Sequence, residues 1–224
     1  MIPPVVDATF LAERAAVSPA EVVLADVRWY LDGRDGRAAF EAAHLPGAVF
    51  VDLERDLAGH DLPVTEGRHP LPEPANFAAA MGALGIGYHS VVVAYDDTGL
   101  TAARLVVMLR MLGRDAAVLD GGLGGWTGPL ETGRSPVRPH ATFTAAPWPA
   151  DRLADADEVV AHIAAGGAVL DARAPERFRG AQAMIDPRPG HVPGARNAPW
   201  AAVLGDDGLL RPVGELRTHF AASG

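Results

Sequence analysis

The chain has 224 residues, 49% of them hydrophobic, which is enough to bury a core in one or two domains. Its net charge of −9 argues against a nucleic-acid groove, because phosphate binding requires clustered cations. The sequence contains no cysteine, so disulfides, thiolate metal sites and cysteine nucleophiles are excluded within these residues.

Targeting and membrane signals are not apparent in the sequence. Residues 1–7 lack the basic and apolar regions of a signal peptide. No apolar run approaches the roughly 20 residues that a membrane span requires. We therefore expect a cytoplasmic protein that does not contact a membrane.

The first predicted strand covers residues 22–28 and ends in an Asp-x-Arg motif. A His-x-Pro-Gly-Ala turn at residues 44–48 leads into a short apolar run. Residues 74–84 have a helical pattern that Gly85 closes, because glycine readily adopts the left-handed conformation that ends helices. This order of elements recurs later in the chain.

The next segment alternates strands with helices. Residues 90–95, Ser-Val-Val-Val-Ala-Tyr, are typical of a buried parallel strand. A polar turn at residues 96–101 precedes a predicted helix over 102–112 and a further strand over 116–119. Such alternation predicts an α/β fold with a parallel sheet flanked by helices on both faces. Ligands of these sheets usually bind at the carboxyl ends of the strands, where residues 96–101 lie.

Residues 131–149 are rich in Pro, Thr and Ser, and we interpret them as a linker. This interpretation divides the chain into a first domain over residues 1–130 and a second over 150–224.

The second domain repeats the landmarks of the first in the same order. Ala-Val-Leu-Asp-Ala-Arg at residues 168–173 matches the first strand, and His-Val-Pro-Gly-Ala at 191–195 matches the turn. A helical pattern follows over residues 214–222. We therefore predict a duplicated unit.

The second copy is predicted to be incomplete. Gly224 matches Gly85, and the first copy runs eleven positions further to reach Asp96. The second copy would then lack its central strand and the loop after it. Because half a parallel sheet leaves backbone groups unpaired, we expect a chain that is incomplete at its C-terminus.

Four motifs together resemble the rhodanese superfamily, and more narrowly the tandem-rhodanese sulfurtransferases. They are Asp-x-Arg, His-x-Pro-Gly-Ala, the Val-Val-Val-x-Tyr strand with its loop, and Leu-Asp-Gly-Gly-Leu-x-x-Trp, which ends at Trp126. The resemblance covers the first copy nearly end to end and the first half of the second. It implies transfer of sulfane sulfur from a small anionic donor, thiosulfate or 3-mercaptopyruvate, to cyanide or a thiol, without a cofactor.

In this family a cysteine in the loop of the second domain carries the sulfur as a persulfide, so the resemblance places the nucleophile beyond Gly224. Backbone N–H groups at a helix N-terminus lower the pKa of such a thiol. In the first copy Asp96 matches the nucleophile, with Gly99 and Thr101 at the family's glycine and threonine positions. A carboxylate is a poor sulfur nucleophile, so this copy is predicted to be silent, with Asp96 and Asp97 capping the helix. An Asp that accepts a phosphoryl group is the alternative.

The resemblance also suggests accessory site residues. Arg177 and Arg188 match arginines that bind the anionic group of the donor, and two guanidinium groups can hold one carboxylate or sulfonate. Alternatively, Arg177 pairs with Glu176. Glu54 and His69 match an acid and a histidine from the first domain, and this pair could relay a proton.

Other polar and aromatic residues have structural interpretations. Trp29 and Tyr30 follow the first strand and belong either to the core or to the lining of a cleft. His44 and His191 each occupy the His-x-Pro-Gly turn of their own copy without neighbouring ligands, so no metal site is predicted.

Two further functions compete with sulfur transfer. A chain that ends at Gly224 and has lost its thiol would be a non-catalytic binding or scaffold module. Related folds with a longer loop hydrolyse phosphate esters, but a phosphatase needs the same missing cysteine. A cellular protein near 23.4 kDa would favour the module, and a heavier one the enzyme.

Overall fold

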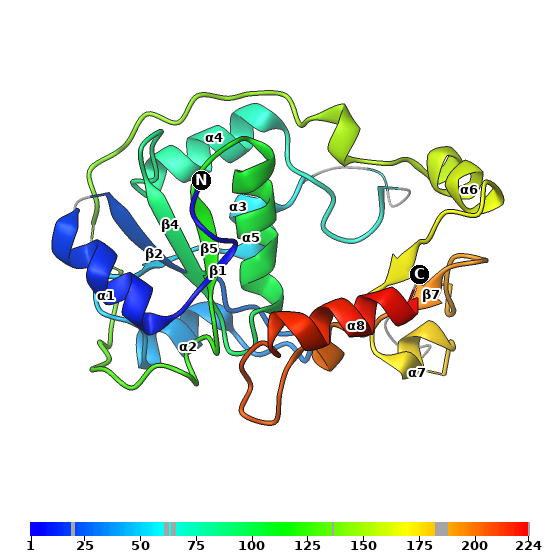
Figure 1. The fold of residues 1–224 in the computed structure, drawn as a ribbon. Coiled ribbons are helices and arrows are strands. Elements are labelled where there is room, and N and C mark those ends of the chain that lie inside the picture. The colour runs from blue at the N-terminus through cyan, green and yellow to red at the C-terminus, as the bar shows by residue number, and fades with distance from the viewer. Residues whose placement is uncertain (19–20, 61–62, 64–65, 136, 182–187, 224) are drawn as a thin grey trace. The chain divides into compact units, whose positions relative to one another are not determined.

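The computed structural model describes residues 1–18, 21–60, 63, 66–135, 137–181 and 188–223. It divides into two compact units, unit 1 (Met1–Pro149) and unit 2 (Ala150–Gly224). Figure 1 shows the elements of both units, coloured from blue at the N-terminus to red at the C-terminus. Among the residues described, no helix has the length and apolar character needed to cross a membrane.

Unit 1 is built on a parallel sheet. In the described part of the chain this sheet has five strands in the order β1-β5-β4-β2-β3. The strands are β1 (Val5–Val6), β2 (Val22–Asp26), β3 (Val49–Phe50), β4 (Val91–Tyr95) and β5 (Ala116–Leu119). The helices are α1 (Ala8–Val17), α2 (Gly36–Ala42), α3 (Leu53–Leu57), α4 (Pro74–Ala83) and α5 (Leu100–Met111). The predicted fold class is confirmed.

Helices cover both faces of this sheet and create two apolar cores (Figure 1). On one face, α1 and α2 contribute Leu11 and Phe40 to a cluster with the strand residue Tyr95. On the other face, α4 and α5 contribute Phe77 and Leu105 to a second cluster. Every residue of β4 is buried, because this central strand is covered on both sides.

The end of unit 1 is held by aromatic side chains in the segment that the sequence suggested as a linker. Phe143 meets Phe77 edge to face, with ring centroids 5.7 Å apart. Trp148 packs against the same core cluster and donates from Nε1 to the carbonyl oxygen of Pro72 at 2.8 Å. These two side chains bury apolar surface, so residues up to Pro149 belong to unit 1.

In the described residues, unit 2 combines two-residue strands with helices of 3 to 11 residues. Its helices are η2 (Ala150–Arg152), α6 (Ala156–Ala164), α7 (Pro175–Phe178), η3 (Trp200–Val203) and α8 (Val213–Ser223). Its sheet, as far as the described residues go, is the parallel pair β6 (Leu170–Asp171) and β7 (Arg196–Asn197). Helix α6 begins with a capping box, in which Asp155 and Glu158 each accept from the other's backbone N–H.

The strand pair of unit 2 reproduces β2 and β3 of unit 1. Asp26 pairs with Phe50 in unit 1, and Asp171 pairs with Asn197 in unit 2. Beyond each pair, the next backbone N–H donates to the Asp carbonyl oxygen. Val51 makes this bond to Asp26 at 2.8 Å, and its counterpart in unit 2 does so to Asp171 at 2.9 Å.

The Asp-x-Arg motif has the same geometry in both units. Arg28 Nη2 donates to Asp26 at 2.8 Å and to the carbonyl oxygen of Ala43 at 2.6 Å. Arg173 Nη2 donates to Asp171 at 2.5 Å and to the carbonyl oxygen of Gly190 at 2.7 Å. In each unit the accepting carbonyl directly precedes the turn histidine.

The two turn histidines are also equivalent. His44 stacks on Phe40 and His191 stacks on Phe178, with ring centroids 3.9 and 3.7 Å apart. In both cases Nδ1 lies 2.8 Å from the phenylalanine's own carbonyl oxygen. Because a carbonyl can only accept, Nδ1 carries the proton. These matched contacts confirm that the fold is duplicated.

Candidate functional site

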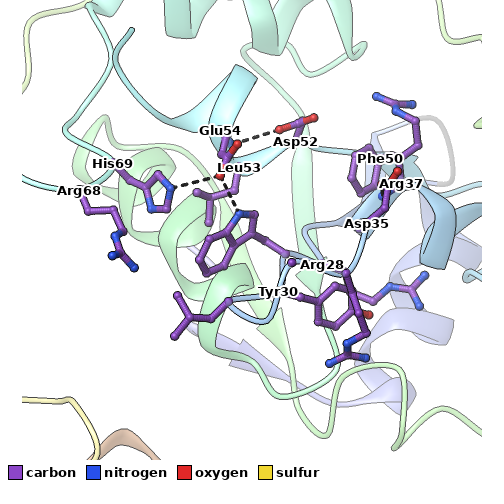
Figure 2. A pocket seen from close by; sticks show the side chains of 15 residues that line it. Arg28, Tyr30, Asp35, Arg37, Phe50, Asp52, Leu53, Glu54, Arg68 and His69 are labelled. Atoms are coloured by element: carbon purple, nitrogen blue, oxygen red, sulfur yellow. Dashed lines mark hydrogen bonds and ion pairs between the residues drawn. The ribbon is translucent and has the colours of Figure 1, made fainter. Parts of the chain in front are cut away.

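A pocket of about 540 Å³ lies beside the carboxyl ends of β2 and β3 in unit 1 (Figure 2). Its lining comes from the segment after β2, from the end of β3 with the start of α3, and from Arg68 and His69. Parallel sheets place loops at this edge, so residues from separate segments of the chain converge there. The lining combines arginines, carboxylates and a histidine with aromatic rings.

Glu54, His69 and Trp29 form a connected group in this pocket. The indole Nε1 of Trp29 donates to Glu54 Oε1 at 3.1 Å, and His69 Nε2 lies 3.6 Å from the same oxygen. The rings of Trp29 and His69 meet edge to face, with centroids 5.1 Å apart. Figure 2 shows Glu54 and His69 side by side. The structure thus brings together the acid and the histidine that the resemblance paired, and places Trp29 in the pocket lining.

The start of α3 fixes the position of Glu54. Asp52 is the N-cap, and its carboxylate accepts from the backbone N–H groups of Glu54 and Arg55, each at 3.1 Å. Asp56 accepts from the backbone N–H of Asp52 at 2.9 Å and pairs with the Arg55 side chain at 2.7 Å. These bonds satisfy N–H groups that have no partner within the helix, so the first turn is well defined.

His69 has a backbone conformation that is unfavourable for its residue type. Its φ is 53°, and among the described residues it is the one non-glycine residue with positive φ. This left-handed conformation costs about 1–2 kcal/mol for a residue with a Cβ. The surrounding structure must therefore restrain it.

The environment of His69 favours the neutral imidazole. Burial lowers the pKa of His69 from its ordinary value, and the charges of Arg104 and Arg68 act in the same direction. Glu54 opposes this shift in pKa but does not reverse it. Near neutral pH the imidazole is therefore available to accept a proton.

The opposite side of the pocket carries cations that the sequence analysis did not single out. The guanidinium group of Arg34 lies 3.8 Å from the centre of the Tyr30 ring, and that of Arg37 lies 4.7 Å from the centre of the Phe50 ring. Tyr30 donates to Asp97 Oδ2 at 2.7 Å. Burial and this carboxylate raise the pKa of Tyr30 to about 12, so the phenol stays protonated.

The loop after β4 surrounds the carboxylate of its first residue, Asp96. Asp96 is 2% exposed, and its Oδ1 accepts from the N–H groups of Thr98, at 2.5 Å, and Gly99. Its Oδ2 accepts from the N–H and Oγ1 of Thr101, both at 2.6 Å, and from the N–H of Ala102 at 2.8 Å. The anion cradle at the N-terminus of α5 is thus filled by the side chain of Asp96.

Two glycines allow this loop to close tightly around Asp96. Gly99 has φ of 83°, a conformation that glycine adopts without strain. A Cβ on Gly122 would collide with the carbonyl oxygen of Asp96. Since both carboxylate oxygens are hydrogen-bonded and the side chain is buried, Asp96 caps the helix and has no free oxygen to accept a phosphoryl group.

The predicted donor-binding arginines lie in unit 2. Arg177 is in α7, and Arg188 follows residues 182–187, which are outside the described part of the chain. Glu176, the alternative partner of Arg177, lies 3.3 Å from Arg179 Nη2. The donor-binding role of Arg177 and Arg188 stays a prediction.

Within the described residues, no group of three or more His, Asp or Glu side chains could hold a metal ion. His44 and His191 instead use one ring nitrogen each to bind a backbone carbonyl oxygen.

Comparisons with known proteins agree with these features. A family model described as a rhodanese-like domain matches residues 12–129. Over 216 residues the chain is 41% identical to a probable 3-mercaptopyruvate sulfurtransferase of Pseudomonas aeruginosa, covering 93% of this chain and 75% of that protein. Over 212 residues it is 41% identical to a putative thiosulfate sulfurtransferase of Mycobacterium tuberculosis, covering 91% and 73%.

Solved structures show the same likeness. SseA from Escherichia coli, a 3-mercaptopyruvate sulfotransferase with a rhodanese fold, superimposes with a TM-score of 0.84 at 32% sequence identity. The match covers 100% of this chain and 84% of SseA. A 3-mercaptopyruvate sulfurtransferase from Leishmania major superimposes with a TM-score of 0.77 at 30% identity, covering 99% of this chain and 63% of that one.

Proposed function

This chain belongs to the tandem-rhodanese sulfurtransferase family, and we propose that it takes part in sulfur transfer. The reaction moves sulfane sulfur from thiosulfate or 3-mercaptopyruvate to a thiophilic acceptor such as cyanide. Both donors appear in the names of its relatives. The sulfur would be carried as a cysteine persulfide. These 224 residues contain no cysteine, so the proposal requires a thiol from outside them and predicts that residues 1–224 alone are inactive.

The observation that carries this proposal is the contact of Glu54 with His69 in the pocket of unit 1. Burial keeps the imidazole neutral, so His69 can take a proton from the acceptor or return one to the departing product. Glu54 orients the ring and stabilises its protonated form. Arg177 and Arg188 would bind the anionic group of the donor, as the resemblance implies.

This role is tested by replacing His69 by Gln in the gene of the source organism and purifying the sulfurtransferase that its cells produce. We expect kcat for thiocyanate formation to fall about 10²-fold with little change in KM, because a positioned acid or base typically contributes at least this factor. His60→Gln is the matched control, since His60 is an exposed histidine near the same loop and does not line the pocket.

The pH profile provides a second readout. The pKa of His69 is lowered, so activity of the unmodified protein should decline only below the ordinary histidine pKa of about 6.5, where the imidazole gains a proton. His69→Gln should lose this acidic limb. A kcat and a pH profile equal to those of His60→Gln would contradict the proposal.

A further inference from the structure

Arg104, in helix α5, binds three backbone carbonyl oxygens. Its Nε and Nη2 donate to Leu57 at 3.1 and 2.7 Å, and Nη2 also donates to His69 at 2.7 Å and Pro70 at 3.2 Å. Burial lowers the pKa of the guanidinium group. The hydrogen bonds described for this cation all go to the main chain, so its role is to hold backbone segments in place.

The three carbonyls belong to the two segments that carry the Glu54–His69 pair. Leu57 is the last residue of α3, whose first turn carries Glu54. The other two carbonyls are those of His69 itself and of the residue after it. A backbone bond from Gly59 N–H to Pro70 O, at 2.9 Å, ties the same two segments together a second time.

We propose that Arg104 is a positioning residue, which fixes the His69 imidazole beside Glu54 by binding the backbone on both sides of the pair. His69 needs such a restraint because its left-handed backbone is unfavourable. The planar fork of arginine can reach several acceptors at once, whereas the ammonium group of lysine is a point charge on a flexible stem. The meaning of this positioning for catalysis rests on the proposed function, but the positioning itself does not.

The test compares Arg104→Met and Arg104→Lys by NMR in the 224-residue chain. Proton contacts between the Trp29 indole and the His69 imidazole report the geometry, and pH titration of the imidazole reports its environment. In Arg104→Met we expect the contact to be lost and the pKa of His69 to rise, because burial and the charge of Arg104 both lower it now. Arg104→Lys should restore the contact only in part.

Two outcomes would overturn the proposal. One is an unchanged Trp29–His69 contact in Arg104→Met, whatever the pKa of His69 does, because loss of the Arg104 charge by itself also shifts that pKa. The other is a match between Arg104→Lys and the unmodified chain in both readouts. A positive charge at this position would then be enough to hold His69, without the planar fork of arginine.

A double-mutant cycle, measured by urea unfolding, tests the proposal even if Arg104→Met is poorly folded. Glycine adopts positive φ without strain, so a restraint on residue 69 matters less in a His69→Gly background. The unfolding midpoint in urea should therefore fall less when Arg104→Met is added to His69→Gly than when it is made alone. Equal shifts in the two backgrounds would overturn the positioning role.

Turnover separates this proposal from the proposed function. In the intact sulfurtransferase, Arg104→Met should lower kcat and move the acidic limb of the pH profile upward, following the pKa of His69. If the NMR contact is lost but turnover is unchanged, Arg104 still positions His69, and the catalytic role of the pair is wrong. If the contact is kept, the positioning role is wrong whatever the turnover.

Discussion

Replacing Arg28 by Met is expected to lower the free energy of unfolding of unit 1 by about 3–5 kcal/mol, the usual cost of removing one partner from a buried ion pair. The side chains of Arg28 and Asp26 are 5% and 0% exposed. The substitution leaves the Asp26 carboxylate in the protein interior without its cation. It also removes the donor that binds the carbonyl oxygen of Ala43 before the turn.

The duplication provides a matched control in Arg173→Met. The equivalent pair in unit 2 is more exposed, with Arg173 at 29% and Asp171 at 13%, so solvent can replace much of the lost interaction. Hydrogen exchange can follow each unit through equivalent amides, Val51 N–H bonded to Asp26 O and Ala198 N–H bonded to Asp171 O. We expect a large loss of protection for Val51 in Arg28→Met and a smaller loss for Ala198 in Arg173→Met. Equal losses of protection would contradict the expectation that the buried ion pair of unit 1 contributes more stability than the exposed pair of unit 2.

The effect of Arg28→Met should depend on pH. Burial raises the pKa of Asp26 above the ordinary carboxyl value, and Arg28 acts against this shift. Without Arg28 the pKa rises further, so the variant is most stable where Asp26 is protonated and loses stability as the pH rises through that pKa. The deficit in unfolding free energy should therefore be smaller at about pH 5 than at about pH 8. A deficit that grows toward acid would contradict this assignment.

Replacing Asp96 by Cys is expected to create a thiol whose pKa lies well below the ordinary value of about 8.5. The backbone N–H groups that now bind the carboxylate would surround the sulfur at the N-terminus of α5. An anion in this cradle is stabilised by these donors and by the helix dipole, so the thiolate is favoured over the thiol. The first unit would thereby gain a thiol of lowered pKa, which its own sequence lacks.

The absence of cysteine from the chain makes this prediction easy to measure, because the variant has a single thiol. The thiolate absorbance or the rate of alkylation, followed against pH, gives its pKa. Val137→Cys is the control, since Val137 is 100% exposed and a thiol there should have the ordinary pKa. If the two thiols titrate together, the loop around Asp96 does not act as an anion cradle.

Much of the fold follows from the sequence because its signals are local. The β-branched run of β4 and the helix after it were predictable, since a strand covered on both faces is apolar throughout. By contrast, β1 (Val5–Val6) has only two residues and pairs with β5, more than a hundred residues away. No period can be read from two residues, so this edge strand was not predicted.

The candidate site was predictable only in part. The resemblance singled out Glu54 and His69, but composition and periodicity gave no sign that they meet. Trp29 gains its role from α3, which holds the Glu54 carboxylate that accepts from its indole N–H. Arg104 gains its role from the loop between α3 and α4, which carries the carbonyl oxygens of His69 and Pro70. In the sequence, Arg104 stands out only as a cation within an apolar helix. This was the one signal that could have pointed to its positioning role.

The most direct test of the account is the intact mass of the protein after incubation with 3-mercaptopyruvate. The sulfurtransferase purified from its own cells should gain the mass of one sulfur atom and lose it again on addition of cyanide. The chain of residues 1–224, treated identically, should gain nothing because it has no thiol. A sulfur bound to residues 1–224, or no gain by the cellular protein with either donor, would contradict the proposal that a thiol outside these residues carries the sulfur.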